Sequence, residues 1–187
     1  MIVDVQPTFC EGGELGVAGG NALAENIARF VEANRDRYAL IVTTQDWHIE
    51  PGDHFAVEPD FVDTWPVHAV AGSPGAELHP ALSQVKADVA IKKGQFTAAY
   101  SGFEGTDSKS RSLAQILGDA GVSALDVIGI AESHCVAATA IDGTKLGFLV
   151  RVLTDLTVPV SPELGEIARQ SMTDAGVELA PSDKPGS

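Results

Sequence analysis

Short apolar runs recur along the chain with the lengths and spacing of buried β-strands. Most runs are nearly continuous rather than alternating with polar residues, which is typical of strands covered on both faces, as in a parallel sheet. We predict five such strands: MIVDV (residues 1–5), ALIVTT (39–44), ADVAI (87–91), LDVIGIA (125–131) and FLVRVL (148–153).

Helical spacing of apolar residues separates several of these runs. Two sets repeat at amphipathic-helix intervals: Leu23, Ile27, Phe30 and Val31, and Leu113, Ile116, Leu117 and Ala120. A third helix is expected from about Ser133 to Leu146, and Ser161-Pro162 supplies the N-cap and first-turn proline of a fourth. Strands that alternate with helices connect through right-handed crossovers. The predicted fold class is therefore α/β, a three-layer α/β/α sandwich with a central parallel sheet.

The length of 187 residues, with 44% hydrophobic and 20% charged residues, fits one globular domain. We assign residues 1–180 to that domain and PSDKPGS (181–187) to a frayed tail. Because MIVDV begins almost inside a strand, we expect either a short first strand or a chain whose start lacks a few residues.

The chain is acidic, with a formal net charge of −14 from 12 basic and 26 acidic residues. This charge repels phosphate backbones and anionic lipid surfaces, which argues against a nucleic-acid partner. No apolar run approaches the roughly 20 residues of a membrane span. The two cysteines, Cys10 and Cys135, lie in different contexts, so we expect a cytoplasmic protein rather than a disulfide-stapled one. The oligomeric state, monomer or homo-oligomer, stays open.

Four reactive side chains lie in or just after predicted strands. Asp4 lies in the first, and Asp46, Lys93 and Cys135 follow the second, third and fourth. The carboxyl ends of parallel strands line one edge of a sheet, so these side chains are expected to converge. Cys135 could attack a carbonyl as a thiolate, Lys93 could stabilise that anion, and Asp4 could carry the proton to a leaving amine.

The stretch VIGIAESHCVAA (127–138) places Cys135 at a predicted helix start, where the helix dipole favours a thiolate. Backbone N–H groups of Ala131 and Cys135 could hold a developing oxyanion. We expect Cys135 to be largely ionised at neutral pH and Cys10 to keep its ordinary pKa. The alternative is that Cys135 is inert packing, the commoner role of a buried cysteine.

The two other candidates differ in how well a structural role explains them. Either Lys92 or Lys93 could be a solvent-facing charge at the strand end, and spacing alone does not say which one points inward. Asp4 is harder to explain as structural, because a carboxylate in a buried strand is costly without a partner.

A second polar cluster occupies QDWHIEPGDH (45–54) and TWPVHAV (64–70), within a long segment that lacks a predicted helix or strand. Asp46 and His48 are two residues apart, so an extended backbone points both the same way. His54 and His68 could reach them by loop folding. One carboxylate and three imidazoles suit one divalent transition metal: zinc, iron or manganese. The alternative is a set of solvated loop side chains.

Aromatic side chains lie near both groups. Phe9, Trp65 and Tyr100 occupy Gly- and Pro-rich loops and would suit a flat ring as ligand, although core packing is the commoner role of any one aromatic. His134 adjoins Cys135 but is expected to face elsewhere in a structural role, and His79 is expected at the surface.

Five segments together resemble the nicotinamidases of the isochorismatase-like cysteine hydrolase superfamily: IVDVQPTFCEGG, TTQDWHIEPGDHF, WPVHAVAGSPGAELHP, KKGQFTAAYSGFEG and GIAESHCVAATAIDG. The likeness runs from Ile2 to about Leu179. It implies a Rossmann-like fold and the hydrolysis of nicotinamide, and commonly of pyrazinamide, to an acid and ammonia.

The resemblance also implies roles for individual residues. It makes Asp4 the acid/base, Lys93 the catalytic lysine and Cys135 the nucleophile. The positions that match its metal ligands are Asp46, His48, His54 and His68. The positions that match its substrate pocket are Phe9, Trp65, Tyr100 and Ile130. Ile130-Ala131 matches a cis peptide that aims an oxyanion-hole N–H.

We therefore predict a metal-containing amidohydrolase that acts on a small molecule through a cysteine thioester. One alternative is an isochorismatase or a hydrolase of another amide, against which the three metal-type histidines argue. The other is a non-catalytic metal-binding or interaction protein with this fold. The intact set of Asp4, Lys93 and Cys135 argues against it, because a binding module needs no such set.

Overall fold

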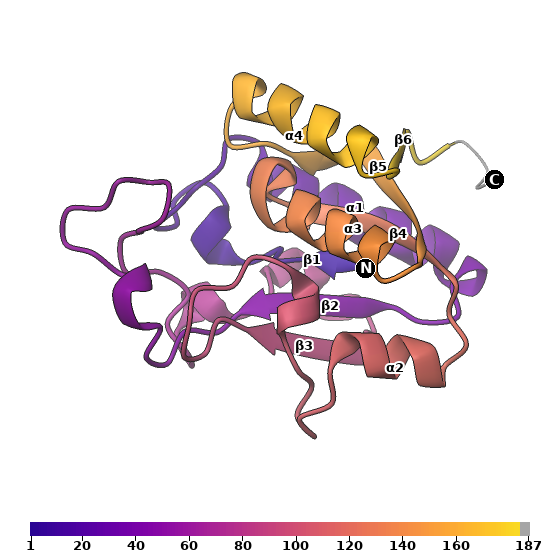
Figure 1. The fold of residues 1–187 in the computed structure, drawn as a ribbon, viewed down its shortest axis with the longest axis horizontal. Coiled ribbons are helices and arrows are strands. Elements are labelled where there is room, and N and C mark those ends of the chain that lie inside the picture. Colours follow the sequence, from indigo (N-terminus) through magenta and orange to yellow (C-terminus); the bar gives the residue numbers. More distant parts are fainter. Residues whose placement is uncertain (184–187) are drawn as a thin grey trace.

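The computed structural model describes residues 1–183, and its strands form one six-stranded sheet (Figure 1). The strands are β1 (Ile2–Val3), β2 (Val42–Asp46), β3 (Val89–Lys93), β4 (Ala124–Ile130), β5 (Leu149–Val158) and β6 (Glu178–Ala180). Their order across the sheet is β3-β2-β1-β4-β5-β6, and all neighbours pair in parallel. The two-residue β1 therefore sits near the middle of the sheet.

The described residues form four α-helices, which lie between strands along the chain: α1 (Gly20–Asn34), α2 (Leu113–Asp119), α3 (Ala137–Lys145) and α4 (Pro162–Asp174). The predicted N-cap of α4 is confirmed, because Ser161 accepts the N–H of Leu164 and Pro162 occupies the first turn. Ser112 caps α2 in the same way through the N–H of Gln115. These caps give the helices defined starts.

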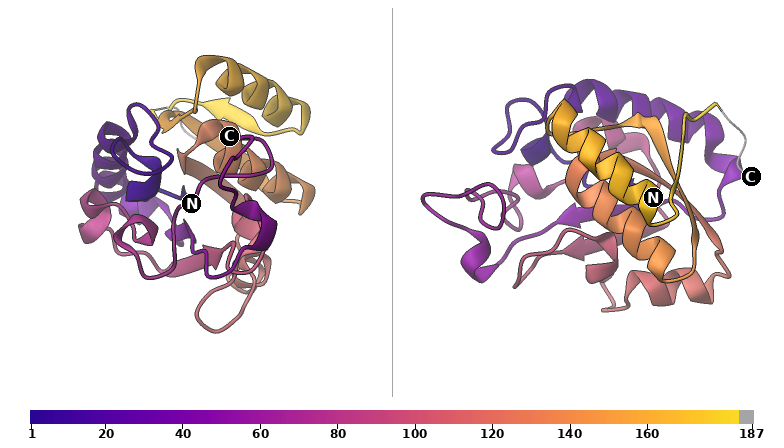
Figure 2. Two further views of the ribbon diagram at one scale, coloured as in Figure 1. Left: turned by 90° about the vertical axis from the view of Figure 1, so that its left-hand side faces the viewer. Right: turned by 45° about the horizontal axis from the view of Figure 1, so that its top comes forward.

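The helices cover both faces of the sheet (Figures 1 and 2). Side chains of α1 pack with Ile2 and Ile128 on one face, and side chains of α2, α3 and α4 pack with Val3 and Val127 on the other. Successive strand residues point to opposite faces, so adjacent residues of one strand enter different cores. The predicted three-layer α/β/α fold is confirmed.

Some local predictions need correction. The edge strand β6 was not predicted, because three residues carry too little pattern to stand out. The helix expected from Ser133 begins instead as a π-helical turn, Glu132–Val136, before α3 continues. Residues 184–187 of the predicted tail lie outside the described residues, while Ser182 donates its backbone N–H and its hydroxyl to Asp155.

Glycine at position 129 lets β1 and β4 approach closely. A Cβ atom there would lie 2.0 Å from the carbonyl oxygen of Val3, and φ is +132°. The pairing of β4 with β5 shifts register between Val127 and Gly129. This irregularity directly precedes Ile130 and Ala131, where β4 ends and the turn at the carboxyl edge of the sheet begins.

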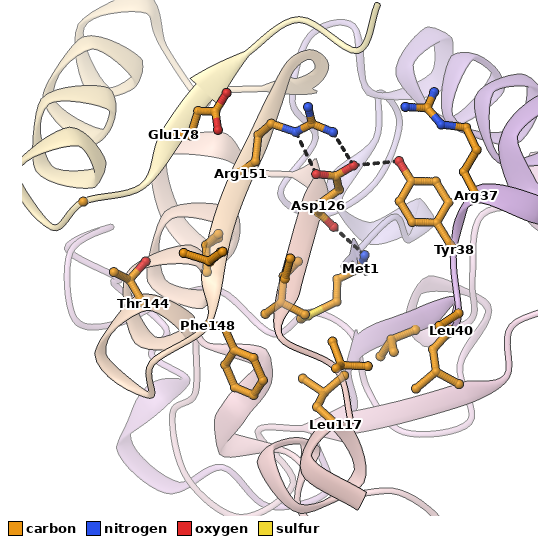
Figure 3. A pocket seen from close by; sticks show the side chains of 18 residues that line it. Met1, Arg37, Tyr38, Leu40, Leu117, Asp126, Thr144, Phe148, Arg151 and Glu178 are labelled. Carbon is orange, nitrogen blue, oxygen red and sulfur yellow. Dashed lines mark hydrogen bonds and ion pairs between the residues drawn. The ribbon is translucent and has the colours of Figure 1, made fainter. Parts of the chain in front are cut away.

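A cavity of about 520 Å³ opens at the opposite, amino edge of the sheet (Figure 3). Its polar wall is built on Asp126, which accepts from Arg151 and from the hydroxyl of Tyr38. The side chains predicted for catalysis or metal binding are absent from its lining. Among residues 1–183, no helix is both long and apolar enough to cross a membrane.

Candidate active site

The carboxyl ends of four strands bring the predicted reactive side chains together. Asp4 follows β1, Asp46 and Lys93 end β2 and β3, and Cys135 lies in the turn after β4. The Lys93 Nζ lies 2.9 Å from Asp4 Oδ2, 2.5 Å from Asp46 Oδ1 and 3.7 Å from Cys135 Sγ. All four residues are buried. One cation is therefore shared by two carboxylates and faces a thiol.

The register of β3 separates the two adjacent lysines. Lys93 is 1% exposed and points into the cluster, whereas the Lys92 Nζ lies 3.0 Å from the ring centroid of Trp47. Burial alone would lower the pKa of Lys93, but Asp4 and Asp46 outweigh it and raise that pKa well above its ordinary value. Lys93 is thus a permanent cation in the site.

Asp4 adopts an uncommon backbone conformation, with φ at +48°. Left-handed backbone at a non-glycine residue costs about 1–3 kcal/mol and is concentrated at functional sites. Its Oδ1 accepts from the Thr44 hydroxyl at 2.6 Å. Burial raises the pKa of Asp4, against the nearby Lys93 and together with Asp46. Asp46 differs, since Lys93 and His48 outweigh its burial and lower its pKa.

Cys135 lies in the π-helical turn rather than in the first turn of an α-helix. The turn closes where the N–H groups of His134 and Val136 both donate to the carbonyl of Ala131, at 3.0 and 3.2 Å. Burial raises the pKa of Cys135 well above its ordinary value, despite Lys93. The expectation of a thiolate at neutral pH is therefore wrong for the resting site.

Cys10 also departs from the expectation. Burial, followed by the charge of Glu11, raises the pKa of its thiol to about 11. The two cysteines therefore differ in their neighbours rather than in resting ionisation. Only Cys135 lies beside a lysine and a carboxylate that can exchange its proton.

The turn before Cys135 also holds the proposed oxyanion donors. The peptide bond between Ile130 and Ala131 is cis, as the resemblance implied. Ala131 and Cys135 are both buried in this turn. The side chain of Ile130 is fully buried and packs in the core beneath α1.

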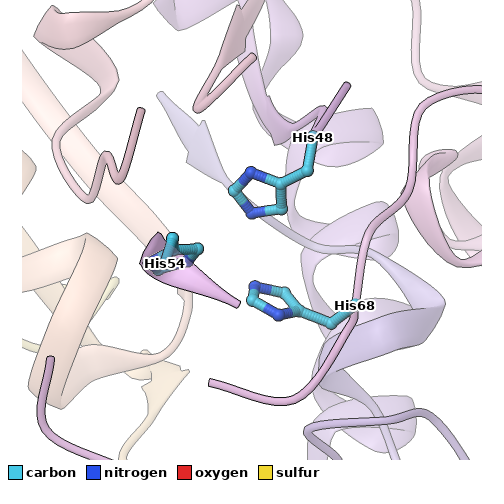
Figure 4. A group of neighbouring side chains, drawn as sticks. All are labelled: His48, His54 and His68. Atoms are coloured by element: carbon cyan, nitrogen blue, oxygen red, sulfur yellow. The ribbon is translucent and has the colours of Figure 1, made fainter. Parts of the chain in front are cut away.

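The side chains of three histidines meet in the segment that follows β2 (Figure 4). One ring nitrogen from each of His48, His54 and His68 lies within 4.8 Å of the others, and all three residues are buried. The Asp46 Oδ2 lies 3.7 Å from His48 Nε2 and 3.9 Å from His68 Nε2. Within residues 1–183, the buried His48 Nε2 and His54 Nδ1 have no hydrogen-bond partner. Such orphaned nitrogens facing one point fit a metal ion.

Backbone carbonyls orient two of these rings. The Nδ1 of His48 lies 2.6 Å from the Gly94 carbonyl oxygen, and the Nδ1 of His68 lies 2.8 Å from that of Pro66. A proton on each Nδ1 leaves the Nε2 lone pair for a metal. Burial, together with the other two rings, lowers the pKa of His54 to about 4, so its imidazole is neutral and can also bind one.

Backbone hydrogen bonds shape the long segment that carries the histidines. His48 exchanges backbone hydrogen bonds with Ala69 and Ala71, and the N–H of Trp65 donates to the carbonyl of His54. Gly94 allows the β3 end to approach His48, because a Cβ there would lie 2.6 Å from the imidazole Cε1. The segment is thus ordered by pairing, with only short 3₁₀ turns as regular structure.

Aromatic rings line the adjoining space. The indole N–H of Trp65 donates to the Tyr100 hydroxyl at 2.9 Å, and the Phe9 ring lies 5.9 Å from that of His68. The ring of His134 lies 5.7 Å from Trp65 and 6.5 Å from Tyr100. His134 therefore faces this aromatic group, contrary to the expectation that it points elsewhere.

Comparison with known proteins agrees with this geometry. Residues 1–184 match the isochorismatase domain. The nicotinamidase/pyrazinamidase of Mycobacterium tuberculosis is 47% identical over 179 residues, which cover 96% of each protein. The chain belongs to the isochorismatase family.

Solved structures of this family superpose along nearly the whole chain. The pyrazinamidase of Pyrococcus horikoshii in complex with zinc has a TM-score of 0.81 and 34% identity, covering 96% of each chain. The PnC1 protein of L. infantum in complex with nicotinate has a TM-score of 0.79 and 34% identity, covering 97% of this chain and 90% of that one. The resemblance seen in the sequence motifs is confirmed.

Sequence reasoning missed Gln6, a buried support of the site in this member of the isochorismatase family. Its amide Nε2 donates to the carbonyls of Asp46 and Ala76, at 3.0 and 2.8 Å, and its Oε1 accepts the N–H of Asp46 at 2.8 Å. Gln6 thus fixes the backbone of Asp46. The available signal was a glutamine directly after the apolar run MIVDV.

Proposed function

We propose that this chain is a nicotinamidase, which hydrolyses nicotinamide to nicotinate and ammonia and accepts pyrazinamide as a related substrate. The observation that carries the proposal is the position of Lys93, shared by Asp4 and Asp46 and directed at Cys135. The zinc and nicotinate bound to similar proteins support it. A flat ring with a carboxamide suits a thiol beside an aromatic group.

The first half of the reaction forms a thioester. Asp4, whose pKa is raised by burial, takes the proton of the Cys135 thiol, and Lys93 stabilises the thiolate. The sulfur attacks the carboxamide carbon, and the N–H groups of Ala131 and Cys135 hold the oxyanion. Asp4 then gives the proton to the leaving nitrogen, so that the C–N bond breaks and ammonia departs.

The second half regenerates the thiol. Asp4, now ionised, removes a proton from a water molecule that attacks the thioester carbonyl. Collapse of this second tetrahedral species breaks the C–S bond, and Asp4 returns its proton to Cys135. The released acid leaves as nicotinate, and its carboxyl proton passes to ammonia, which becomes ammonium. Lys93 keeps its charge throughout, since its pKa is raised by the two carboxylates.

The residues that would hold a metal are Asp46, His48, His54 and His68. We propose one divalent transition metal there, zinc, iron or manganese. When bound, the ion would supply a Lewis-acidic contact for the pyridine nitrogen of the substrate and so orient the ring. Asp46 would link the two halves of the site, because its carboxylate contacts Lys93 and faces two imidazoles.

Trp65, Tyr100 and Phe9 are proposed to bind the ring of the substrate, whereas the side chain of Ile130 is buried in the core beneath α1 and is not placed in the pocket. A cytoplasmic location is proposed because Cys10 and Cys135 are both free thiols, which a reducing compartment preserves.

The deciding experiment is an ammonia-release assay on the purified chain with nicotinamide, and with pyrazinamide in parallel. Nicotinate should appear in equal amount. A protein that contains the metal yet releases no ammonia from either amide would overturn the proposal.

A further inference from the structure

The turn that carries Cys135 contains a buried carboxylate that the proposed mechanism does not use. Glu132 is 0% exposed and lies between Ala131 and Cys135. Its Oε1 lies 2.6 Å from Arg169 Nε as an ion pair. Its Oε2 accepts from Arg169 Nη2 at 3.3 Å and from the Thr157 hydroxyl. Burying a carboxylate is costly even when it is paired, so this arrangement calls for a role.

The partners of Glu132 come from two other elements. Thr157 lies near the end of β5, and Arg169 projects from α4. A second contact holds the same turn: the Ser133 hydroxyl accepts the N–H of Val160 at 3.1 Å, in the segment between β5 and α4. The turn from Ala131 to Cys135 is therefore held in place by contacts with β5, with α4 and with the segment between them.

These contacts fix the backbone N–H groups of Ala131 and Cys135, whose positions matter in the proposed reaction. Oxyanion donors stabilise a transition state only when they are fixed at hydrogen-bond distance before the charge develops. A misplacement of about 1 Å can cost roughly 100-fold in rate. The exposed part of Arg169 leaves its charge partly screened by solvent, whereas the Glu132 end is enclosed.

We propose that Glu132 and Arg169 are positioning residues, whose ion pair fixes the turn that presents the backbone N–H groups of Ala131 and Cys135. The inference rests on the proposed function. The pair acts through the turn and does not touch the substrate. Its loss should therefore lower kcat and leave ground-state binding nearly unchanged.

The test compares Glu132→Gln, Arg169→Lys and Arg169→Met in the ammonia-release assay. Glu132→Gln and Arg169→Met should lower kcat by about 10- to 100-fold, with KM within about twofold of wild type. Arg169→Lys keeps a cation within reach of Glu132, so it should recover part of the loss. Arg169 is partly exposed, so its variants keep the test open if Glu132→Gln fails to fold.

A binding measurement separates positioning from a general structural role. Nicotinaldehyde can add the Cys135 thiol across its carbonyl, with a new C–S bond and the thiol proton passing to the oxygen, and so occupy the oxyanion site. Its affinity should fall in parallel with kcat/KM in the variants. The affinity for nicotinate, which forms no such adduct, should stay within about twofold.

Asp126→Asn is the matched control. It removes a carboxylate from another enclosed pair, in which Arg151 Nη2 lies 2.7 Å from Asp126 Oδ2 at the far edge of the sheet. This variant should lower the unfolding temperature without changing kcat.

Three results would count against the inference. If Glu132→Gln and Arg169→Met unfold earlier than wild type but keep kcat within about twofold, the pair is only structural. If nicotinate and nicotinaldehyde lose affinity equally, the pair shapes the substrate pocket instead. An inactive wild type overturns the proposed function, and this inference with it.

Discussion

The two edges of the sheet each hold an ion-pair network, which is buried at the carboxyl edge and partly buried at the amino edge, and the networks differ in how well their polar atoms are satisfied. At the amino edge, Asp126 receives the guanidinium of Arg151 on both oxygens and the hydroxyl of Tyr38 on one (Figure 3). At the carboxyl edge, Lys93 is shared by two carboxylates and a thiol. Two imidazole nitrogens beside it have no partner within residues 1–183.

This difference shows that a cavity does not by itself mark the reactive site. The cavity of about 520 Å³ lies at the amino edge, where the network is complete and holds no nucleophile. The carboxyl edge holds the incomplete network, and buried polar atoms without partners are costly unless a ligand or a reaction uses them. Four predictions test this distinction.

The largest expected effect is on the nucleophile. Cys135→Ala should lower ammonia release by at least about 10³-fold, because no other group in the cluster can form the thioester. Cys10→Ala is the control, since Cys10 is a buried thiol in the core beneath α1. It should keep activity within about twofold. Near-normal turnover by Cys135→Ala would rule out the thioester mechanism.

The next effect separates the two adjacent lysines. Lys93→Met leaves Asp4 and Asp46 buried without their cation, so it should destabilise the fold by about 3–5 kcal/mol and abolish turnover. Lys92→Met removes only a cation–π contact with Trp47, worth about 0.5–1 kcal/mol. Urea unfolding together with the activity assay measures both. Equal unfolding midpoints for the two variants would contradict the shared-cation geometry.

Metal content is the third test. His48→Ala should lower the metal bound per chain after dialysis, because it removes a ligand of the proposed site. His79→Ala is the control, since His79 caps a 3₁₀ turn and contacts Asn21 away from the cluster. Elemental analysis of wild type and both variants is the measurement. The same metal content in all three proteins would exclude these histidines as ligands.

The smallest effect concerns pH. Burial lowers the pKa of His54 to about 4, below the ordinary value of 6.5, and lowers that of His68 as well. As pH falls, the histidines of the unfolded chain therefore bind protons before those of the folded chain do. The stability that the buried neutral imidazoles contribute is fully present above the ordinary pKa of 6.5 and is lost as the pH falls towards about 4.

Urea unfolding with excess chelator, at about pH 7 and about pH 5, measures this loss. The free energy of unfolding should be lower at the acidic pH, and His54→Gln should reduce the difference. If the stability of His54→Gln depends on pH in the same way as that of wild type, His54 is not buried in its neutral form.

Local sequence was sufficient for much of this protein. Among residues 1–183, apolar runs and helical spacing predicted five of the six strands and all four α-helices, because both patterns report which faces are buried. The rule that parallel strands end at one edge was enough to bring Asp4, Asp46, Lys93 and Cys135 together. Two-residue spacing also placed Asp46 and His48 on the same side.

Tertiary structure decided the features that depend on desolvation and distant partners. Cys135 was expected to be ionised from its place near a helix start, but its enclosure raises the pKa of the thiol. Gln6 holds Asp46 from 40 residues away along the chain, and Glu132 meets Arg169 at a separation of 37. No periodicity encodes such pairs, because burial and partner geometry exist only once the layers have packed.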